Sequence, residues 1–240
     1  MRHILENDIL RIEIESFGAE LKSVKNKSTG QEYMWQADPT YWGRTSPVLF
    51  PFVGSLNNKC YTYEGQTYEM GQHGFARDME FSLISKTESD IYFELVSNEE
   101  TFKKYPFNFT LGLGYQLSGN ELKVIWKVFN TSTDKVLHFS IGAHPAFNCP
   151  IHGEENKAGY QFYFAGANEI HHHGHTDTGL SIEEDVVLPL ENHRATITPE
   201  FFDGSTYIIE GPQTNEIGIE DPEGNRFITV GFDMPIVALW

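Results

Sequence analysis

The sequence predicts an all-β protein, built as an antiparallel β-sandwich or barrel. Apolar residues alternate with polar ones over many short segments, which is typical of strands that bury one face. Clusters of glycine, proline, asparagine and serine separate these segments at intervals of about 8–12 residues. A helical spacing of apolar residues is not sustained over about twelve residues anywhere in the chain. These three observations favour packed antiparallel strands over a helical or α/β fold.

Taken in chain order, the first strand is predicted at Leu10, Ile12 and Ile14, which alternate with charged residues. A short helical turn is predicted at residues 98–104, because Pro106 would end it. The clearest hairpin joins residues 109–117 to residues 122–128, since a turn with glycine and asparagine separates two alternating segments. The remaining predicted strands are residues 91–96, 136–141, 161–164, 207–209, 217–219, 227–230 and 236–240.

Length and charge limit the possible functions. The 240 residues suit a single domain over residues 1–240, and their formal net charge is −17. Such acidity argues against nucleic acid or an anionic membrane as the main partner, because phosphate binding needs a basic face. Residues 1–8 carry acids where a signal peptide would need an apolar run, and no apolar stretch approaches the ~20 residues of a membrane span. A cytoplasmic location is therefore expected, with Cys60 and Cys149 as thiols.

Two arginines and a histidine stand out in the first half of the chain. Arg44 is the one basic residue in the apolar, proline-rich run of residues 42–54. Its guanidinium would suit the hydroxyls of a ligand, and it would equally suit a structural role on backbone carbonyls. His73 and Arg77 lie four residues apart around a glycine and a phenylalanine, a pattern that also fits a plain surface turn.

A second histidine lies further along, in a setting with small neighbours. His144 follows the predicted strand at residues 136–141 and precedes Pro145, which favours extended backbone at the histidine. An imidazole held in this way at a strand end suits a general acid or base. A core histidine bonded to a backbone carbonyl explains the pattern equally well.

Four histidines fall within residues 171–175 and raise the question of a metal. On a strand, only His171, His173 and His175 would share a face. The cysteines lie far away, and Glu169 and Asp177 are not at a known ligand spacing. Residues 165–180 are therefore interpreted as a polar loop without a physiological metal, and a metal-dependent enzyme is the less favoured alternative.

Five motifs, in this order, resemble the aldose 1-epimerase (galactose mutarotase-like) superfamily, and in particular its LacX-like branch. They are Gly18–Ser23, Arg44–Pro51, Gln72–Arg77, Gly142–Asn148 and Met234–Trp240, so the resemblance spans the whole chain. The two histidine-containing motifs are specific when they occur together at this separation. The resemblance raises both histidines above the structural alternatives.

The resemblance implies an antiparallel β-supersandwich that holds a sugar, and an enzyme that interconverts the α and β anomers of a free hexose such as glucose or galactose. His144 would be the acid that protonates the ring oxygen O5, and a histidine is expected to have a suitable pKa near 7 with little tuning. His73, Arg44 and Arg77 would bind the substrate. The reaction needs no metal or organic cofactor.

The sequence departs from the family pattern in two places. The LacX-like pattern has an aspartate before the strand at residues 207–209, where Ser205 stands here and Asp203 lies two residues earlier. Either residue is left open for that role. The family's catalytic base is a glutamate on a strand that follows the segment matched by Met234–Trp240, so the domain is expected to be incomplete at its C-terminal end and to lack its last strands.

Two other functions stay open at this stage. The first is a non-catalytic protein that binds or senses a sugar on the same fold, because fold alone does not determine function. The second is a hexose-6-phosphate 1-epimerase, which the net charge of −17 disfavours. The expected partner is a small aldose, with the protein as a monomer or homodimer.

Overall fold

The computed structural model describes residues 1–240 except 154–155, 177–178, 203–205 and 212. The chain folds as two compact units, the N-terminal unit Met1–Asn148 and the C-terminal unit Cys149–Trp240. Nearly all regular structure in the described residues is antiparallel strand, so the predicted all-β class is confirmed. One domain over residues 1–240 stays a prediction.

The N-terminal unit contains β1 (Arg2–Glu6), β2 (Leu10–Glu15), β3 (Glu20–Asn26), β4 (Val48–Leu49), β5 (Cys60–Tyr63), β6 (Gln66–Glu69), β7 (Ser82–Lys86), β8 (Asp90–Val96), β9 (Phe109–Ser118), β10 (Glu121–Asn130) and β11 (Gly142–Ala143). It also contains the α-helix α1 (Glu99–Lys104) and two 3₁₀ turns, η1 (Asn57–Lys59) and η2 (Ala76–Asp78).

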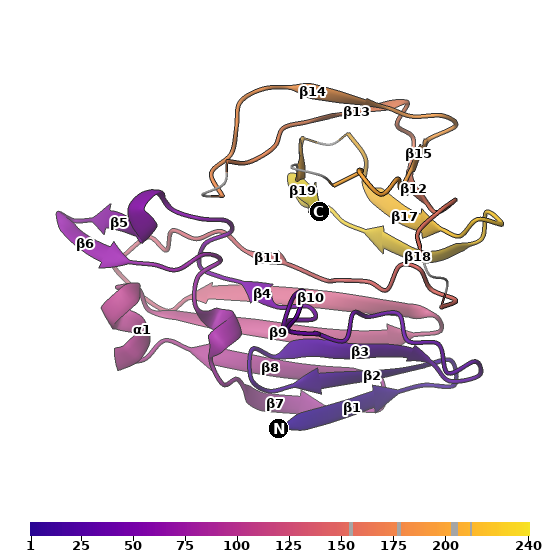
Figure 1. Ribbon diagram of the computed structural model, residues 1–240. Coiled ribbons are helices and arrows are strands. Elements are labelled where there is room, and N and C mark those ends of the chain that lie inside the picture. Colours follow the sequence, from indigo (N-terminus) through magenta and orange to yellow (C-terminus); the bar gives the residue numbers. More distant parts are fainter. Residues whose placement is uncertain (154–155, 177–178, 203–205, 212) are drawn as a thin grey trace. The chain divides into compact units, whose positions relative to one another are not determined.

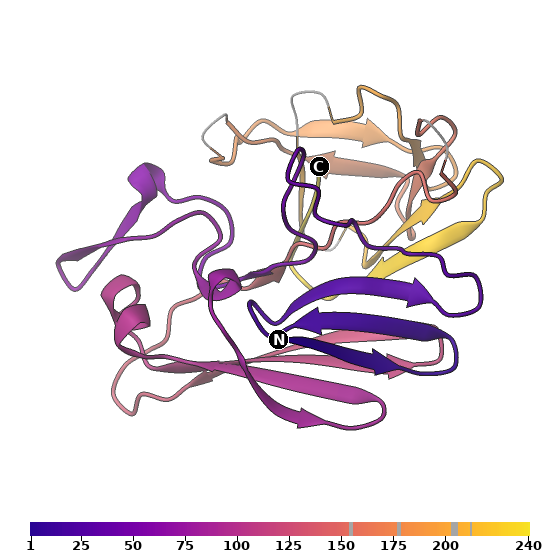
Figure 2. The same ribbon diagram turned by 60° about the horizontal axis from the view of Figure 1, so that its bottom comes forward.

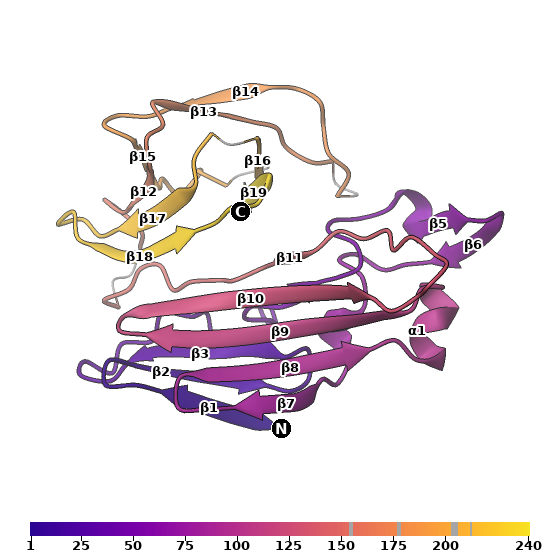
Figure 3. The ribbon, with the colours of Figure 1, turned by 180° about the vertical axis from the view of Figure 1, so that it is seen from behind.

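Two antiparallel sheets form the body of this unit, in the strand orders β1-β2-β3 and β10-β9-β8-β7. They lie face to face as two layers (Figures 1 and 3), with one apolar cluster between them. In β2, Leu10, Ile12 and Ile14 are buried and the charged residues between them are partly exposed, as their alternation predicts. Phe93 and Leu111 are fully buried in the opposite layer. Burying each such side chain contributes about 1.5–3 kcal/mol.

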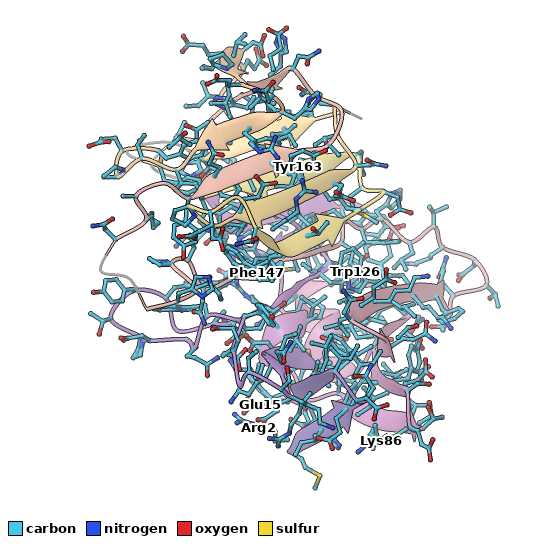
Figure 4. The ribbon with its side chains drawn as sticks, turned by 90° about the vertical axis from the view of Figure 1, so that its right-hand side faces the viewer. Arg2, Glu15, Lys86, Trp126, Phe147 and Tyr163 are labelled. Carbon is cyan, nitrogen blue, oxygen red and sulfur yellow. The ribbon has the colours of Figure 1, made fainter. Side chains whose placement is uncertain are left out.

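Charged side chains lie on the solvent side of the first sheet. Arg2 of β1 is in register with Glu15 of β2, and Arg2 Nη2 lies 2.7 Å from Glu15 Oε1. Figure 4 shows the two side chains next to each other on these adjacent strands. The pair is largely exposed, so it contributes only about 0.2–1 kcal/mol.

Strand β9 brings two glycines under the ring of Tyr92 in β8. A Cβ atom at Gly112 would lie 1.7 Å from the Tyr92 hydroxyl oxygen, and one at Gly114 would lie 3.0 Å from Tyr92 Cδ2. The ring covers the part of the sheet that these residues leave without side chains, and Lys127 Nζ lies 5.2 Å from its centre. The small residues that alternate with leucine in this segment therefore make room for one aromatic side chain.

The predicted helical turn at residues 98–104 is confirmed as α1. Asn98 caps it, because its Oδ1 accepts hydrogen bonds from the backbone N–H groups of Glu100 and Thr101 at 2.9 and 3.1 Å. The Thr101 hydroxyl in turn accepts the backbone N–H of Asn98 at 2.8 Å, which completes a capping box. The helix lies at the same end of the unit as the β5–β6 hairpin (Figure 2).

The prediction of a strand at residues 136–141 is wrong. The chain there is irregular, and only β11 pairs with β4, with Gly142 opposite Leu49 and Ala143 opposite Val48. The backbone N–H of Ser140 still donates to the carbonyl of Pro51 at 2.9 Å. Proline has no N–H to return the bond, so the ladder does not continue.

The C-terminal unit contains β12 (Gln161–Phe164), β13 (Glu169–His172), β14 (Val186–Pro189), β15 (Arg194–Thr196), β16 (Tyr207–Glu210), β17 (Glu216–Glu220), β18 (Arg226–Gly231) and β19 (Ile236–Leu239). The predicted strands in this part of the chain are confirmed, with small shifts at their ends. They form the sheet β15-β12-β17-β18 and the pairs β13-β14 and β16-β19.

A buried carboxylate organises the larger sheet of the C-terminal unit. The Glu220 side chain is 3% exposed and lies between two guanidinium groups, at 2.7 Å from Arg194 Nε and 3.0 Å from Arg226 Nη2. The Arg226 guanidinium also lies 3.5 Å from the centre of the Tyr163 ring. These contacts compensate the charge that the sheet buries.

The interpretation of residues 165–180 as a polar loop is wrong for part of that range. Residues 169–172 form β13, which pairs with β14. Ile170 and His172 face inward and are buried, and Glu169 and His171 are exposed. The His172 ring lies 4.2 Å from the Tyr207 ring, so an aromatic contact gives this histidine an apolar place in the strand.

Candidate active site

The predicted site residues of the N-terminal unit are brought together around β4 and the residue that follows it. His144 comes directly after β11, and its backbone N–H donates to the carbonyl of Pro47 at 3.1 Å. Phe50, just after β4, forms a parallel bridge with Gly74. The segments that carry His73 and His144 are thus hydrogen-bonded to the stretch of chain that follows Arg44.

The loop that carries His73 has an unusual backbone. His73 and Gly74 both have left-handed φ angles, +64° and +72°. A Cβ atom at Gly74 would lie 2.1 Å from the carbonyl oxygen of Phe50, so only glycine fits there. The close approach presses the histidine loop against the end of β4.

The two imidazoles face each other, with ring centroids 5.7 Å apart and planes nearly perpendicular. The backbone N–H of Gly54 donates to His73 Nδ1 at 3.0 Å, so a neutral His73 carries its proton on Nε2. Burial, together with the Arg77 and Arg44 cations, lowers the pKa of His73 to about 4. His73 is therefore a neutral hydrogen-bond donor at pH 7.

Trp42 covers the other imidazole. Its ring stacks on the ring of His144 with centroids 4.5 Å apart and an angle of 28° between the planes. His144 is only 9% exposed. Burial lowers the pKa of His144 to about 3, and neighbouring His73 and Arg77 act in the same direction. This value lies well below the expected pKa near 7, so His144 is also neutral in the unliganded protein at pH 7.

One aspartate links the two arginines. Asp78 Oδ1 lies 2.7 Å from Arg44 Nη2, and Asp78 Oδ2 lies 3.9 Å from Arg77 Nε. Arg77 Nη2 donates to the carbonyl of Gln72 at 2.8 Å. Burial lowers the pKa of Arg77, and the Arg44 cation contributes to the shift. The shared aspartate reduces the repulsion between the two guanidinium groups.

Sequence reasoning missed the roles of Asp78 and Trp42. Both lie inside or beside motifs that it singled out, since Trp42 is two residues before Arg44 and Asp78 directly follows Arg77. The sequence alone suggests Asp78 as a partner of its neighbour Arg77. Its shorter contact is with Arg44, 34 positions away in the chain, which no local pattern indicates.

A cavity of about 430 Å³ opens beside this cluster. Its lining contains three acids and two bases, and the bases already face carboxylates: Arg44 contacts Asp78, and Lys22 Nζ lies 3.3 Å from Glu20 Oε1. Such a lining offers donors and acceptors to hydroxyl groups and no unpaired cation to a phosphate. The lining residues are Glu15, Phe17, Glu20, Lys22, Trp42, Gly43, Arg44 and Asp78.

The histidines of residues 171–175 do not share a partner. His171 Nδ1 lies 2.9 Å from Asp185 Oδ2 and its Nε2 lies 3.4 Å from Glu169 Oε1, and hydrogen bonds to these carboxylates raise the pKa of His171. His173 Nε2 lies 3.7 Å from Glu210, and His175 Nδ1 contacts the carbonyl of Thr176 at 2.9 Å. Among the described residues, no group of three potential metal ligands converges.

The choice between Asp203 and Ser205 for the family's aspartate lies outside the described residues. The described part of the chain contains no helix long and apolar enough to cross a membrane.

A sequence model of the aldose 1-epimerase family matches residues 1–217. The chain belongs to the aldose 1-epimerase family. Two curated relatives, the plasmid and chromosomal LacX proteins of Lactococcus lactis subsp. lactis, are each 32% identical to it over 244 residues. Each alignment covers 98% of this chain and 81% of the relative, which confirms the resemblance to the LacX-like branch.

Solved structures share both fold and sequence with this member of the family. A galactose mutarotase related enzyme from Lactobacillus acidophilus is 36% identical with a TM-score of 0.92, and the match covers 100% of this chain and 80% of that one. A galactose mutarotase-like protein from Lactobacillus casei is 31% identical with a TM-score of 0.87, and the match covers 100% of this chain and 82% of that one. These matches confirm the galactose mutarotase-like fold.

Proposed function

We propose that this protein is an aldose 1-epimerase that interconverts the α and β anomers of a free hexose such as glucose or galactose. The observation that carries the proposal is the pair of imidazoles 5.7 Å apart, with Arg44 and Arg77 beside them, in a chain of the aldose 1-epimerase family. Anomer exchange requires a group that transfers a proton at O5, for which one imidazole is suited, and donors that hold the hydroxyls of the sugar, which the second imidazole and the guanidinium groups supply.

The reaction opens and recloses the sugar ring. A base takes the proton of the O1 hydroxyl while an acid gives a proton to O5, so the C1–O5 bond breaks and an open-chain aldehyde forms. Rotation about C1–C2 presents the other face of the carbonyl to the O5 hydroxyl, and closure returns both protons. We assign His144 to the proton transfer at O5, and His73 Nε2–H to a hydrogen bond with the sugar.

The low pKa of His144, about 3, adds a condition to this mechanism. The ring rests in its neutral form in the unliganded protein, so it must take up a proton from solvent when the sugar binds. It then gives this proton to O5 as the ring opens and receives it back on closure. Negative charge that develops on the sugar as O1 loses its proton favours the imidazolium form. The identity of the base stays a prediction from the resemblance, as a glutamate.

The two arginines bind the substrate in this proposal. A guanidinium presents several N–H donors in a fixed plane, which suits the neighbouring hydroxyls of a pyranose. Asp78 holds Arg44 in one orientation through the 2.7 Å contact. A neutral sugar is favoured over a hexose 6-phosphate, because Lys22 and Arg44 in the adjoining cavity already contact carboxylates.

The cytoplasm is the compartment we propose, as the cysteine-poor sequence leads us to expect.

Polarimetry or NMR exchange with freshly dissolved α-glucose and α-galactose tests the activity. We expect anomer exchange well above the spontaneous rate, with a hexose 6-phosphate as the poorer substrate. A background rate together with saturable sugar binding would refute the enzyme and leave a sugar-binding protein. A preference for the phosphorylated sugar would refute the choice of substrate.

A further inference from the structure

A buried carboxylate that none of the proposed chemistry uses lies where the turn between β2 and β3 ends. Glu20, the first residue of β3, is 8% exposed. Its Oε1 accepts two backbone N–H bonds, from Thr45 at 2.7 Å and from Ser46 at 3.0 Å. Lys22 Nζ lies 3.3 Å from the same oxygen. A buried carboxylate with several partners of this kind holds its neighbours firmly.

Those two amides directly follow Arg44 in the chain. Residues 35–47 form no helix or strand, so sheet hydrogen bonds do not fix the backbone that carries this arginine. On the far side, the carbonyl of Thr45 accepts the N–H of Ala146 at 2.9 Å. Glu20 therefore supplies acceptors that a neighbouring strand would otherwise supply to this segment.

The same turn is also fixed to the segment that carries Arg77. The backbone N–H of Gly18 donates to the carbonyl of Met79 at 2.7 Å. A Cβ atom at Gly18, where φ is +72°, would lie 2.8 Å from the carbonyl oxygen of Arg77, so the two backbones are in direct contact. Within a few residues of sequence, the turn thus contacts the backbone of both arginine segments.

We propose that Glu20 is a positioning residue that fixes the backbone of the Arg44 segment, so that the Arg44 guanidinium is held ready for the hydroxyls of the hexose. This inference rests on the proposed function. Asp78 fixes the charged end of Arg44 and Glu20 fixes its main-chain end. Losing Glu20 should weaken sugar binding through Arg44 much more than it slows the proton transfer at His144.

The test compares three replacements of Glu20 by steady-state anomer exchange. Glu20→Ala removes the acceptor of both N–H bonds and should raise KM about tenfold or more, because hydrogen bonds to a charged group are strong, while kcat stays within about threefold. Glu20→Asp withdraws the carboxylate by one C–C bond, about 1.5 Å, and should raise KM to a smaller extent. Glu20→Gln keeps one oxygen for both amides and should restore KM to near the wild-type value.

Glu32 provides a matched control in the same unit. Its Oε1 also accepts two backbone N–H bonds, from Val24 and Met34, both at 3.0 Å, and these partners lie outside the Arg44 segment. Glu32→Ala should lower the urea midpoint of unfolding and leave KM unchanged. Equal effects of the two alanine variants on KM would show that Glu20 is merely structural, and would overturn the proposal.

A double-mutant cycle shows whether Glu20 acts through Arg44. In an Arg44→Ala background, Glu20→Ala should change kcat/KM by less than about twofold, because the group it positions is already gone. If the losses in kcat/KM of the two single variants add fully in the double variant, the proposal is overturned. If the wild type binds hexose without exchanging anomers, the proposed function fails on its own, and the same cycle read as Kd by calorimetry still decides the role of Glu20. Should Glu20→Ala not fold, the aspartate and glutamine variants carry the comparison.

Discussion

Replacing His144 by asparagine should make the folded protein less sensitive to acid. The imidazole is 9% exposed, stacked on Trp42, and close to His73 and Arg77. Burial and these neighbours lower the pKa of His144 from 6.5 to about 3, so the folded state disfavours the charged ring. In the unfolded chain the same ring titrates near its ordinary pKa of about 6.5.

The sign and size of the effect follow from this difference in pKa. Below pH 6.5 the unfolded chain binds a proton that the folded protein does not, so the free energy of unfolding falls as the pH falls. The stability from neutral His144 is fully present above pH 6.5 and is lost progressively toward the folded pKa of about 3. Between pH 6.5 and pH 4, about 2.5 units at 1.36 kcal/mol each, the loss reaches at most about 3 kcal/mol.

Urea unfolding of wild type and His144→Asn at several pH values between 7.5 and 4 measures this difference. At pH 7.5 the ring is neutral in both the folded and the unfolded state. The difference in free energy of unfolding between wild type and variant at this pH therefore reports only the lost packing, and it serves as the internal reference. On acidification the wild type should lose up to about 3 kcal/mol more than the variant. Parallel pH dependences would refute the reasoning, because they would show that the folded protein accommodates a charged His144.

Further predictions concern activity and folding. His144→Asn should lower kcat about 10²–10⁴-fold, and a drop under about threefold in an anomer-exchange assay would make this residue structural. Asp78→Asn should raise KM about two- to fivefold with little change in kcat, since a half-exposed ion pair contributes up to about 1 kcal/mol; lower kcat at constant KM would contradict this. Gly74→Ala should destabilise the protein by more than about 3 kcal/mol, because its Cβ would lie 2.1 Å from the Phe50 carbonyl oxygen. The control Gly119→Ala, also at positive φ but with open space around it, should lower the free energy of urea unfolding by only about 1 kcal/mol, and equal losses would exclude the clash. EDTA should leave anomer exchange unchanged, and a loss reversed by added divalent metal would restore the metal hypothesis.

The fold was predictable where a strand shows a clear alternation of apolar and polar residues, and β13, whose buried face contains a histidine, was missed. The hairpin of β9 and β10 follows from the alternation of apolar and polar residues and from the turn between the two strands. Successive residues of a strand face opposite sides of the sheet, so the alternation fixes which face each side chain occupies. The segment at residues 136–141 has the same kind of apolar content and failed, since its would-be partner includes Pro51. Pairing depends on the partner strand, which a local pattern does not contain.

The site was predictable only as separate motifs. Hydrogen bonds around Val48–Phe50 bring His73 and His144, which are far apart in the sequence, to the stretch of chain that follows Arg44. The resemblance to a family anticipated that grouping, and periodicity did not. The low pKa of His144 was missed for a related reason, because it depends on the burial that Trp42 and the surrounding chain produce.

The ring of Tyr92 over Gly112 and Gly114 has a consequence for evolution of the family. A methyl group at Gly112 would lie 1.7 Å from the tyrosine hydroxyl oxygen, so a side chain there requires the Tyr92 ring to move or to be replaced by a smaller residue. Among relatives, a side chain at the position of Gly112 should occur together with a small residue at the position of Tyr92. The two substitutions should therefore arise together during evolution. Ancestral chains that carried only one of the two changes should be less stable than chains with both or with neither.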